Sequence, residues 1–170
     1  MIPLALQPPR STISIRPVRL TDSETLYNRC WPHRPFAGVY NLISRMTRLA
    51  HDERGLGLVV LDDCGEVQGY GQMAMWPTCA EISDLIITEA YRSHGFGTAL
   101  IQHLTREAVR LQAPAVEIGA ALSNPRATQL YRRMGFEDSH TLMLNLGQGK
   151  EAVLFLRLEL RGKKLDGISA

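Results

Sequence analysis

Two glycines, Gly95 and Gly97, lie between a segment rich in Ile and Leu and a segment whose apolar residues have helical spacing. Residues 80–88 predict a strand, and the residues after Gly97 predict a helix. Small residues allow a ligand to approach the backbone, and unpaired N–H groups at a helix start favour an anion, typically a phosphate. The alternative is that the glycines only form a tight turn. The segment is not a Walker loop and lacks the third glycine of the dinucleotide fingerprint, so ATP and NAD are disfavoured.

A second group of chemically useful residues follows Asn124-Pro125. This pair predicts a helix N-cap followed by a proline in the first turn. Ala127, Leu130 and Tyr131 then recur at the spacing of a buried helix face. Tyr131 is therefore either a core aromatic residue or a group whose hydroxyl does chemistry, and the pattern alone leaves both interpretations open.

The cysteines and histidines lack the spacing of a metal site or a disulfide framework. Three cysteines are an odd number without a Cys-x-x-Cys pair, and the five histidines show no ligand spacing. Cys79 lies close to Glu81, but no histidine neighbours it in the sequence, so we expect a structural cysteine rather than a nucleophile. We therefore expect no bound metal, and the cysteine usage favours a reducing cytoplasm.

The remaining patterns predict the elements that position these residues. Their order is one strand, two helices, three strands, a helix, a strand, a helix and two strands, which defines an α/β fold with a mixed sheet. Residues 21–24 predict a capping box at the start of the first helix, and Gly135 predicts a left-handed C-cap at the end of the last. The predicted segments are a strand near 13–15, helices from 21 to about 31 and over 38–51, strands at 56–61, 67–75 and 80–88, a helix through 100–111, a strand at 116–121, a helix after 124, and a hairpin at 142–146 and 153–160.

Length and composition indicate one globular domain. The 170 residues are 45% hydrophobic and 21% charged, which is ordinary for a single soluble domain. Nineteen basic and 17 acidic residues give a net charge of +2, too small to imply a nucleic acid or a membrane surface as partner. No apolar segment approaches the ~18 residues that span a bilayer. We expect the domain to cover residues 12–161, between an N-terminal tail at 1–11 and a C-terminal tail at 162–170.

Two motifs resemble signatures of a known superfamily. Residues 84–101 (DLIITEAYRSHGFGTALI) resemble the acetyl-CoA signature of the GNAT superfamily of N-acetyltransferases, with Arg92, Gly95 and Gly97 at its Arg/Gln-x-x-Gly-x-Gly/Ala positions. Residues 124–136 (NPRATQLYRRMGF) resemble its second signature. The resemblance implies an α/β fold with a mixed, mostly antiparallel central sheet of about seven strands flanked by about four helices.

The resemblance also implies that the chain binds acetyl-CoA as acyl donor. The backbone N–H groups of residues 92–98 would bind the pyrophosphate, and residues 85–87 would pair their backbone with the pantetheine arm where two strands splay apart. The N–H of Leu85 or Ile86 would stabilise the oxyanion of the thioester, and Asn124 would hold the arm from the opposite strand. The implied cofactor-binding residues are Leu85, Ile86, Ile87, Arg92, Ser93, His94, Gly95, Phe96, Gly97, Thr98, Asn124 and Tyr131.

Two catalytic residues follow from the same resemblance. Tyr131 matches the tyrosine whose hydroxyl can give a proton to the departing CoA thiolate, because thiol and phenol pKa values differ by only about 1.5 units in model compounds. An amine acceptor arrives protonated and needs a base or a water relay. Glu81, eleven residues before Arg92, matches the catalytic glutamate of histone-type acetyltransferases and is favoured over Asp84 on the same strand.

The acceptor site is implied to lie among residues 31–36, Trp76 and the hairpin loop around Gln148. These loops carry no acidic run, which disfavours a polycationic acceptor. We expect an N-acetyltransferase that transfers the acetyl group to a primary amine, of a small molecule, an amino acid or a protein, by direct attack in a ternary complex. The alternatives are a peptide or protein N-terminal acetyltransferase and a non-catalytic acyl-CoA-binding regulatory module. A homodimer is an option, because closing strands of this superfamily often pair across a dimer.

Overall fold

The structure, a computed structural model, describes residues 12–147 and 149–160, which form seven strands, four α-helices and two short 3-10 turns. The order along the chain is the one predicted from the sequence. The elements are β1 (Ser14–Pro17), η1 (Leu20–Asp22), α1 (Ser23–Cys30), α2 (Phe36–His51), β2 (Gly55–Leu61), β3 (Val67–Met75), β4 (Ala80–Ile87), η2 (Glu89–Tyr91), α3 (Phe96–Arg110), β5 (Ala115–Ala121), α4 (Pro125–Arg133), β6 (Glu137–Asn145) and β7 (Lys150–Glu159).

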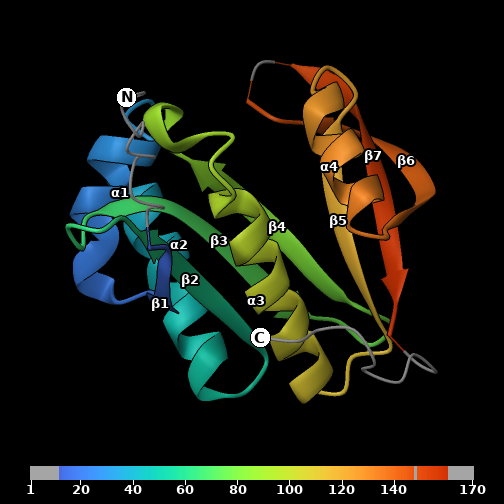
Figure 1. The fold of residues 1–170 in the computed structure, drawn as a ribbon, viewed down its shortest axis with the longest axis horizontal. Coiled ribbons are helices and arrows are strands. Elements are labelled where there is room, and N and C mark those ends of the chain that lie inside the picture. Colours follow the sequence, from blue (N-terminus) through green and yellow to red (C-terminus); the bar gives the residue numbers. More distant parts are fainter. Residues whose placement is uncertain (1–11, 148, 161–170) are drawn as a thin grey trace, which may run out of the picture.

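All seven strands form one sheet in the order β1-β2-β3-β4-β5-β7-β6 (Figure 1). Every neighbouring pair is antiparallel except β4 and β5, which run parallel. A parallel pair needs a crossover connection, and α3 supplies it. The mixed, mostly antiparallel sheet flanked by four helices is thereby confirmed.

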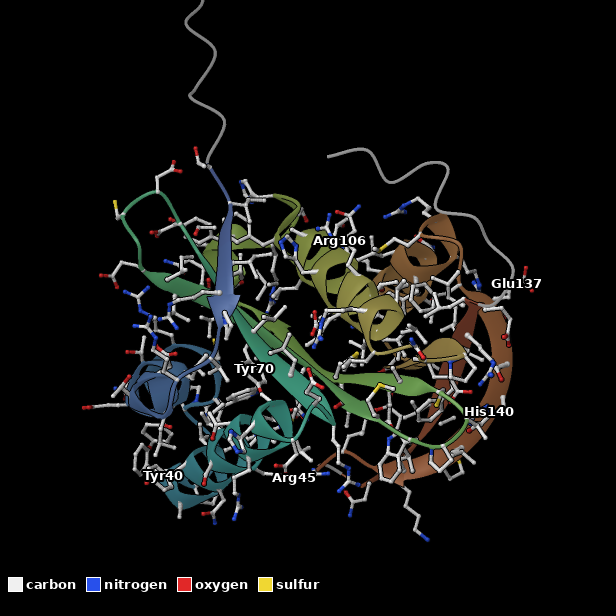
Figure 2. All side chains as sticks on the ribbon, turned by 90° about the horizontal axis from the view of Figure 1, so that it is seen from below. Tyr40, Arg45, Tyr70, Arg106, Glu137 and His140 are labelled. Carbon is white, nitrogen blue, oxygen red and sulfur yellow. The ribbon has the colours of Figure 1, made fainter. Side chains whose placement is uncertain are left out.

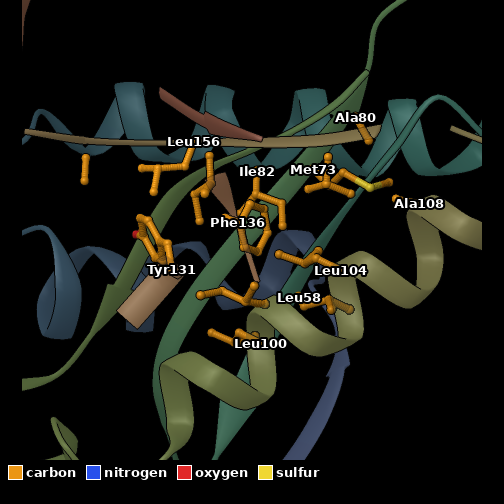
Figure 3. Packing of buried hydrophobic residues seen from close by; sticks show 14 of the residues in the cluster. Leu58, Met73, Ala80, Ile82, Leu100, Leu104, Ala108, Tyr131, Phe136 and Leu156 are labelled. Carbon is orange, nitrogen blue, oxygen red and sulfur yellow. The ribbon is translucent and has the colours of Figure 1, made fainter. Parts of the chain in front are cut away.

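Two cores hold the helices to the sheet. The larger core lies under α3 and α4, where Leu100 and Leu104 of α3 pack with Ile82 of β4 (Figure 3). The second core joins α1 and α2 to the other face, with Leu26 and Ile43 completely buried. Its strand residues come from β2, β3 and β4, so the same face of β5, β7 and β6 is not part of it.

The predicted capping box at residues 21–24 is wrong. Residues 20–22 form a 3-10 turn, and α1 begins at Ser23. The carboxylate of Asp22 accepts hydrogen bonds from the backbone N–H of Arg19 at 2.7 Å and from both terminal nitrogens of Arg16 at 2.8 Å. The prediction failed because Arg16 of β1, which lies outside the helix, binds both oxygens of the Asp22 carboxylate.

The closing hairpin is longer than its apolar pattern predicts. Strand β6 begins at Glu137 rather than at residue 142, and β7 begins at Lys150 rather than at 153. Residues 137–141 are polar and exposed on an edge strand, so no alternation of apolar residues marks them. Gly135, in contrast, has the predicted left-handed conformation with φ +92°.

None of the helices in the described part of the chain combines the length and apolarity needed to cross a membrane. Both predicted tails, 1–11 and 162–170, lie outside the described residues, as do Arg161 at the end of the expected domain and Gln148 in the last hairpin.

Candidate active site

Strands β4 and β5 pair over three residues and then separate. Residues 80–82 of β4 lie opposite residues 116–118 of β5, and beyond them the two strands diverge (Figure 1). A gap of about 240 Å³ opens there, with Asp84, Asn124 and Tyr131 among its lining residues. The splay that the resemblance implied between these strands is therefore present.

A β-bulge lies on β4 beside this gap. Ser83 pairs with Gln72 of β3 and Ile86 pairs with Tyr70, so β4 has one extra residue between the two pairs. Asp84 occupies the bulge with a left-handed φ of +50°. Because a bulge leaves its extra residue unpaired in the ladder, backbone groups of β4 are available beside the gap.

A groove of about 710 Å³ connects the glycine loop, residues 92–98, to the gap. It passes between the end of β4, the segment before α3 and the face of α4 that includes Tyr131. His94 and Phe96 do not line it: the ring of Phe96 is buried against Tyr91, and His94 Nδ1 lies 2.7 Å from the carbonyl oxygen of Arg92. The predicted residues that do line the groove are Leu85, Ile86, Ile87, Arg92, Ser93, Gly95, Gly97, Thr98, Asn124 and Tyr131.

The start of α3 has the geometry of an anion site. Gly95 is the N-cap residue and adopts φ +84°, a conformation that favours glycine. The N–H of Ala99 donates to the carbonyl of Gly95 at 2.9 Å. The N–H groups of residues 96–98 therefore precede the intrahelical pattern, and the positive end of the helix dipole adds to their attraction for a phosphate.

A hydrogen-bond network ties the segment before this loop to the turn between β2 and β3. The hydroxyl of Tyr91 donates to Asp62 Oδ2 at 2.9 Å. The same carboxylate accepts from the backbone N–H groups of Glu66 and Cys64 and from the side-chain amide of Gln68. These donors hold the pKa of Asp62 below its ordinary value, and the bond to Asp62 raises the pKa of Tyr91. The β2–β3 turn thus fixes the residue that leads into the glycine loop.

Two arginines of α4 line the groove and were missed by sequence reasoning. Arg126 and Arg133, with Leu130 between them, are spaced four and three residues apart and share one helix face. Arg126 donates to Ser93 Oγ and so joins α4 to the glycine loop. Together with Arg92, from the segment before α3, they make the lining of the groove basic. A helical projection of residues 125–133 contains this signal, because these side chains are neighbours on the helix face that includes Tyr131.

Tyr131 is both a core aromatic and a groove residue. Its side chain is buried, 5% exposed, and its ring centroid lies 6.3 Å from that of Phe136 (Figure 3). It also lines both the groove and the gap. Burial raises its pKa to about 12. Asn124 lines the same two spaces and accepts a hydrogen bond from the N–H of Ala127, which confirms the predicted N-cap of α4.

The two candidate bases occupy different places on β4. Asp84 lines the gap, whereas Glu81 lines neither the gap nor the groove. Glu81 lies opposite Ala74 of β3 and Glu117 of β5. Because Ala80 and Ile82 face the larger core, alternation along the strand places Glu81 on the opposite face, toward the side of α1 and α2.

The predicted acceptor residues differ in exposure. Trp31 is buried, with its ring 5.4 Å from that of Tyr70 in an edge-on arrangement. Phe36 and Trp76 are exposed, and Phe36 contacts the ring of Tyr27. Trp31 therefore contributes to the second core, while the other two leave apolar surface open to solvent.

Cys79 is buried, and burial is the main cause that raises the pKa of its thiol. A thiol with a raised pKa is a poor nucleophile, which supports the structural role expected from the sequence. Within residues 12–147 and 149–160, no three His, Cys, Asp or Glu side chains are grouped to hold a metal ion.

The sheet splays beside a helix start that is suited to an anion, and a groove lined with arginines leads into the gap. This combination is typical of an α/β domain that binds an extended ligand carrying phosphate. Residues 20–136 match the model of the acetyltransferase (GNAT) family. The chain belongs to this family of acyltransferases, whose acyl donor is acetyl-CoA.

Among solved structures, the chain is similar to yncA, a putative acetyltransferase from Salmonella typhimurium determined with its cofactor acetyl-CoA. The TM-score is 0.73 at 19% identity, over 91% of this chain and 97% of that one. It is also similar to a chimera of the spermidine N-acetyltransferase SpeG from Vibrio cholerae and hSSAT, with a TM-score of 0.71 at 20% identity over 86% and 95% of the two chains. At these identities the similarity establishes the fold.

A curated relative, an uncharacterized N-acetyltransferase of Methanocaldococcus jannaschii, is 32% identical over 63 residues. The match covers 37% of this chain and 28% of the relative, so the chain spans little more than a quarter of that protein.

Proposed function

We propose that the chain is an N-acetyltransferase that binds acetyl-CoA in the groove and transfers the acetyl group to a primary amine by direct attack in a ternary complex. The observation that carries the proposal is the continuity of groove and gap. Asn124 and Tyr131 line both spaces, so one extended ligand can reach from the glycine loop to the bulge.

In this proposal the pyrophosphate, the pantetheine arm and the thioester of acetyl-CoA each have a partner. The pyrophosphate binds the N–H groups of residues 92–98, beside the guanidinium groups of Arg126 and Arg133. The pantetheine arm pairs with the backbone of residues 85–87 as an added strand. The first or second N–H of that segment, next to the bulge, stabilises the negative charge that develops on the thioester oxygen.

The chemistry then needs one proton acceptor and one proton donor. Glu81, acting through water, takes a proton from the ammonium form of the acceptor, and the amine nitrogen bonds to the acetyl carbon while the carbon–sulfur bond breaks. Tyr131 donates a hydrogen bond to the departing sulfur, which takes up the second proton that the amine nitrogen loses as the amide forms. The products are an acetamide, the CoA thiol and one proton released to water.

The experiment that tests this proposal is a calorimetric titration with acetyl-CoA, with NAD and ATP as controls for general attraction to phosphate. We expect saturable one-to-one binding of acetyl-CoA alone, followed by release of CoA thiol when amines are added. No binding would overturn the proposal. Binding without thiol release from any amine would replace it with the non-catalytic acyl-CoA-binding module.

For the cellular setting we propose a reducing cytoplasm. Cys30, Cys64 and Cys79 are free thiols, and Cys64 is exposed in the β2–β3 turn. Exposed free thiols persist in reducing compartments.

For assembly we propose a homodimer that uses β6. This strand is at the edge of the sheet and exposes Leu142, Met143 and the neighbouring Leu146. An exposed edge with apolar residues is a template for pairing with a second chain. Light scattering of the purified protein gives the molar mass, and a monomer at micromolar concentration would contradict this assembly.

A further inference from the structure

An ion pair between Arg34 and Asp84 lies beside the gap. Asp84 lines the gap, and the side chain of Arg34 reaches Asp84 from the segment between α1 and α2. Nη1 and Nη2 of Arg34 lie 3.3 and 3.2 Å from one oxygen, Oδ1. In the Arg16–Asp22 pair, by contrast, two nitrogens meet two oxygens at 2.8 Å. The contact of Arg34 is longer and uses a single oxygen, so its guanidinium keeps N–H donors for another anion.

Local structure holds this guanidinium in place. The backbone N–H of Arg34 donates to the carbonyl of Trp31 at 3.0 Å, and the guanidinium carbon lies 4.8 Å from the centroid of the Trp31 ring. A cation over an indole face is attracted to it, and the ring of Trp31 is itself fixed against Tyr70. The Arg34 side chain is nevertheless 48% exposed. It is therefore both positioned and open to a ligand.

A chain of hydrogen bonds orients the carboxylate of Asp84. Burial raises the pKa of Tyr70 far above its ordinary value, so its hydroxyl stays protonated and donates to Gln72 Oε1 at 2.8 Å. The amide nitrogen of Gln72 consequently faces β4 and donates to Ser83 Oγ and to Asp84 Oδ2, at 3.1 Å each. The bulge brings Ser83 and Asp84 to the same face, at the cost of a left-handed backbone at Asp84.

We propose that the acceptor is an α-amino acid, or a molecule with the same arrangement of ammonium and carboxylate, and that Asp84 binds its ammonium while Arg34 binds its carboxylate. This inference rests on the proposed acetyltransferase function. A zwitterion presents two opposite charges a few ångströms apart, as the Arg34–Asp84 pair does. Each member of the pair then gains a second partner without losing the first, and the ammonium is held beside the gap where the thioester would lie.

Amines without a carboxylate match this surface less well. The ammonium of such an amine must compete with Arg34 for Asp84, and the amine has no carboxylate that could bind the guanidinium. Glu117, which lies opposite Glu81 in the β4–β5 ladder, forms an ion pair with Arg157 at 2.8 Å, so it adds no free carboxylate to Asp84 and Glu81 for a polyamine to use. A peptide N-terminus carries an amide where the amino acid carries its carboxylate. The proposal therefore places free amino acids above both polyamines and peptides.

The test measures CoA thiol release at saturating acetyl-CoA with the twenty L-amino acids, and with the α-amide and the decarboxylated amine of the best one. We expect kcat/KM for that amino acid to exceed the value for its amide and its amine at least about tenfold, as for hydrogen bonds between charged groups. In Arg34→Gln we expect KM for the amino acid to rise at least about tenfold with little change in kcat, and the preference over the amide to disappear.

Arg45→Gln is the matched control, because Arg45 is an exposed arginine of α2 that projects outward from it (Figure 2). It should behave as the wild type, and both variants should bind acetyl-CoA with unchanged affinity. Amides, peptides or polyamines that react as well as amino acids, or an Arg34→Gln variant with unchanged preference, would overturn the inference and leave the acetyltransferase function intact. Bound acetyl-CoA without thiol release from any amine would overturn both.

Discussion

At the scale of the residue, burial changes what Tyr131 can contribute. Model compounds place the phenol pKa only about 1.5 units above that of a thiol. In the structure burial raises the pKa of Tyr131 to about 12, which widens the difference to roughly 3.5 units. Complete transfer of the proton to a CoA thiolate is then uphill. We therefore propose that Tyr131 acts mainly by donating a hydrogen bond to the departing sulfur.

This role predicts the effect of Tyr131→Phe. The ring stays in the core, so the fold and the groove are kept, but the hydrogen bond to the sulfur is lost. We expect kcat to fall about 10- to 100-fold and the Kd for acetyl-CoA to change less than about twofold. Because the raised pKa keeps the phenol protonated as pH rises, Tyr131 should cause no alkaline loss of wild-type kcat below about pH 11. A variant with wild-type kcat would remove the assignment.

The two carboxylates of β4 should differ in which kinetic constant they change. Their α-carbons are three residues apart, roughly 10 Å along a strand, so they cannot share one role. If Glu81 is the base that acts through water, Glu81→Gln lowers kcat with little change in the KM of the amine. If Asp84 binds the ammonium, Asp84→Asn raises that KM at least about tenfold. Steady-state kinetics on both variants measure kcat and the KM of the amine and so distinguish the two roles. A loss of kcat in Asp84→Asn alone would make Asp84 the base.

At the scale of the element, local signals determined what the sequence could predict. The start of α3 at the glycines, the cap of α4 at Asn124 and the C-cap at Gly135 were predictable because each depends on neighbouring residues. The first half of β6 was not predictable, because its residues are polar and exposed and show no alternation of apolar residues. The Arg34–Asp84 pair could not be predicted either, because it joins residues 50 positions apart and depends on a bulge that has no sequence pattern.

The glycine loop gives a prediction in which stability and binding move in opposite directions. Gly97 lies in the first turn of α3 and lines the groove, and a Cβ there would meet its first neighbour, Ile87, at an ordinary 3.8 Å. Gly97→Ala should therefore stabilise the free protein by up to about 1 kcal/mol, because alanine loses less backbone entropy in a helix. The added methyl group occupies space that the pyrophosphate needs.

We expect the melting temperature of Gly97→Ala to rise by about 1–3 °C and its Kd for acetyl-CoA to increase about tenfold. Scanning calorimetry and titration calorimetry measure the two quantities. Greater stability with unchanged affinity would show that the pyrophosphate does not approach this turn.

The network around Asp62 predicts that the β2–β3 turn supports binding at a distance. Tyr91→Phe removes the hydroxyl that joins the glycine loop to Asp62 and keeps the ring contact with Phe96. Acetyl-CoA must then order the loop on binding, so we expect its KM to rise about 3- to 10-fold with kcat unchanged. Tyr40→Phe is the matched control, because Tyr40 is an exposed tyrosine of α2 (Figure 2). Equal effects in both variants would contradict this positioning role.

At the scale of the whole molecule, the sheet consists of two halves with a short seam. One half contains β1 to β4, the other contains β5, β7 and β6, and the seam is the three-residue pairing of β4 with β5. The chain crosses this seam through α3, whose N-terminus carries the candidate anion site. A ligand that occupies both the groove and the gap therefore contacts both halves and the start of the helix that connects them.

Binding of acetyl-CoA should consequently stabilise the protein and change backbone protection on both sides of the seam. At a concentration 100 times its Kd, the ligand adds about 2.7 kcal/mol to the free energy of unfolding, which corresponds to a rise of roughly 5–10 °C in melting temperature for a chain of this size. Hydrogen exchange should slow at residues 85–87 of β4 and in the segment from 119 to 124 after the seam, because the pantetheine arm pairs with the first and contacts the second. Residues of β2, which line neither space, should exchange as before. Protection confined to the glycine loop would show that the phosphates bind there while the arm stays outside the gap, and the direct-transfer geometry would then be wrong.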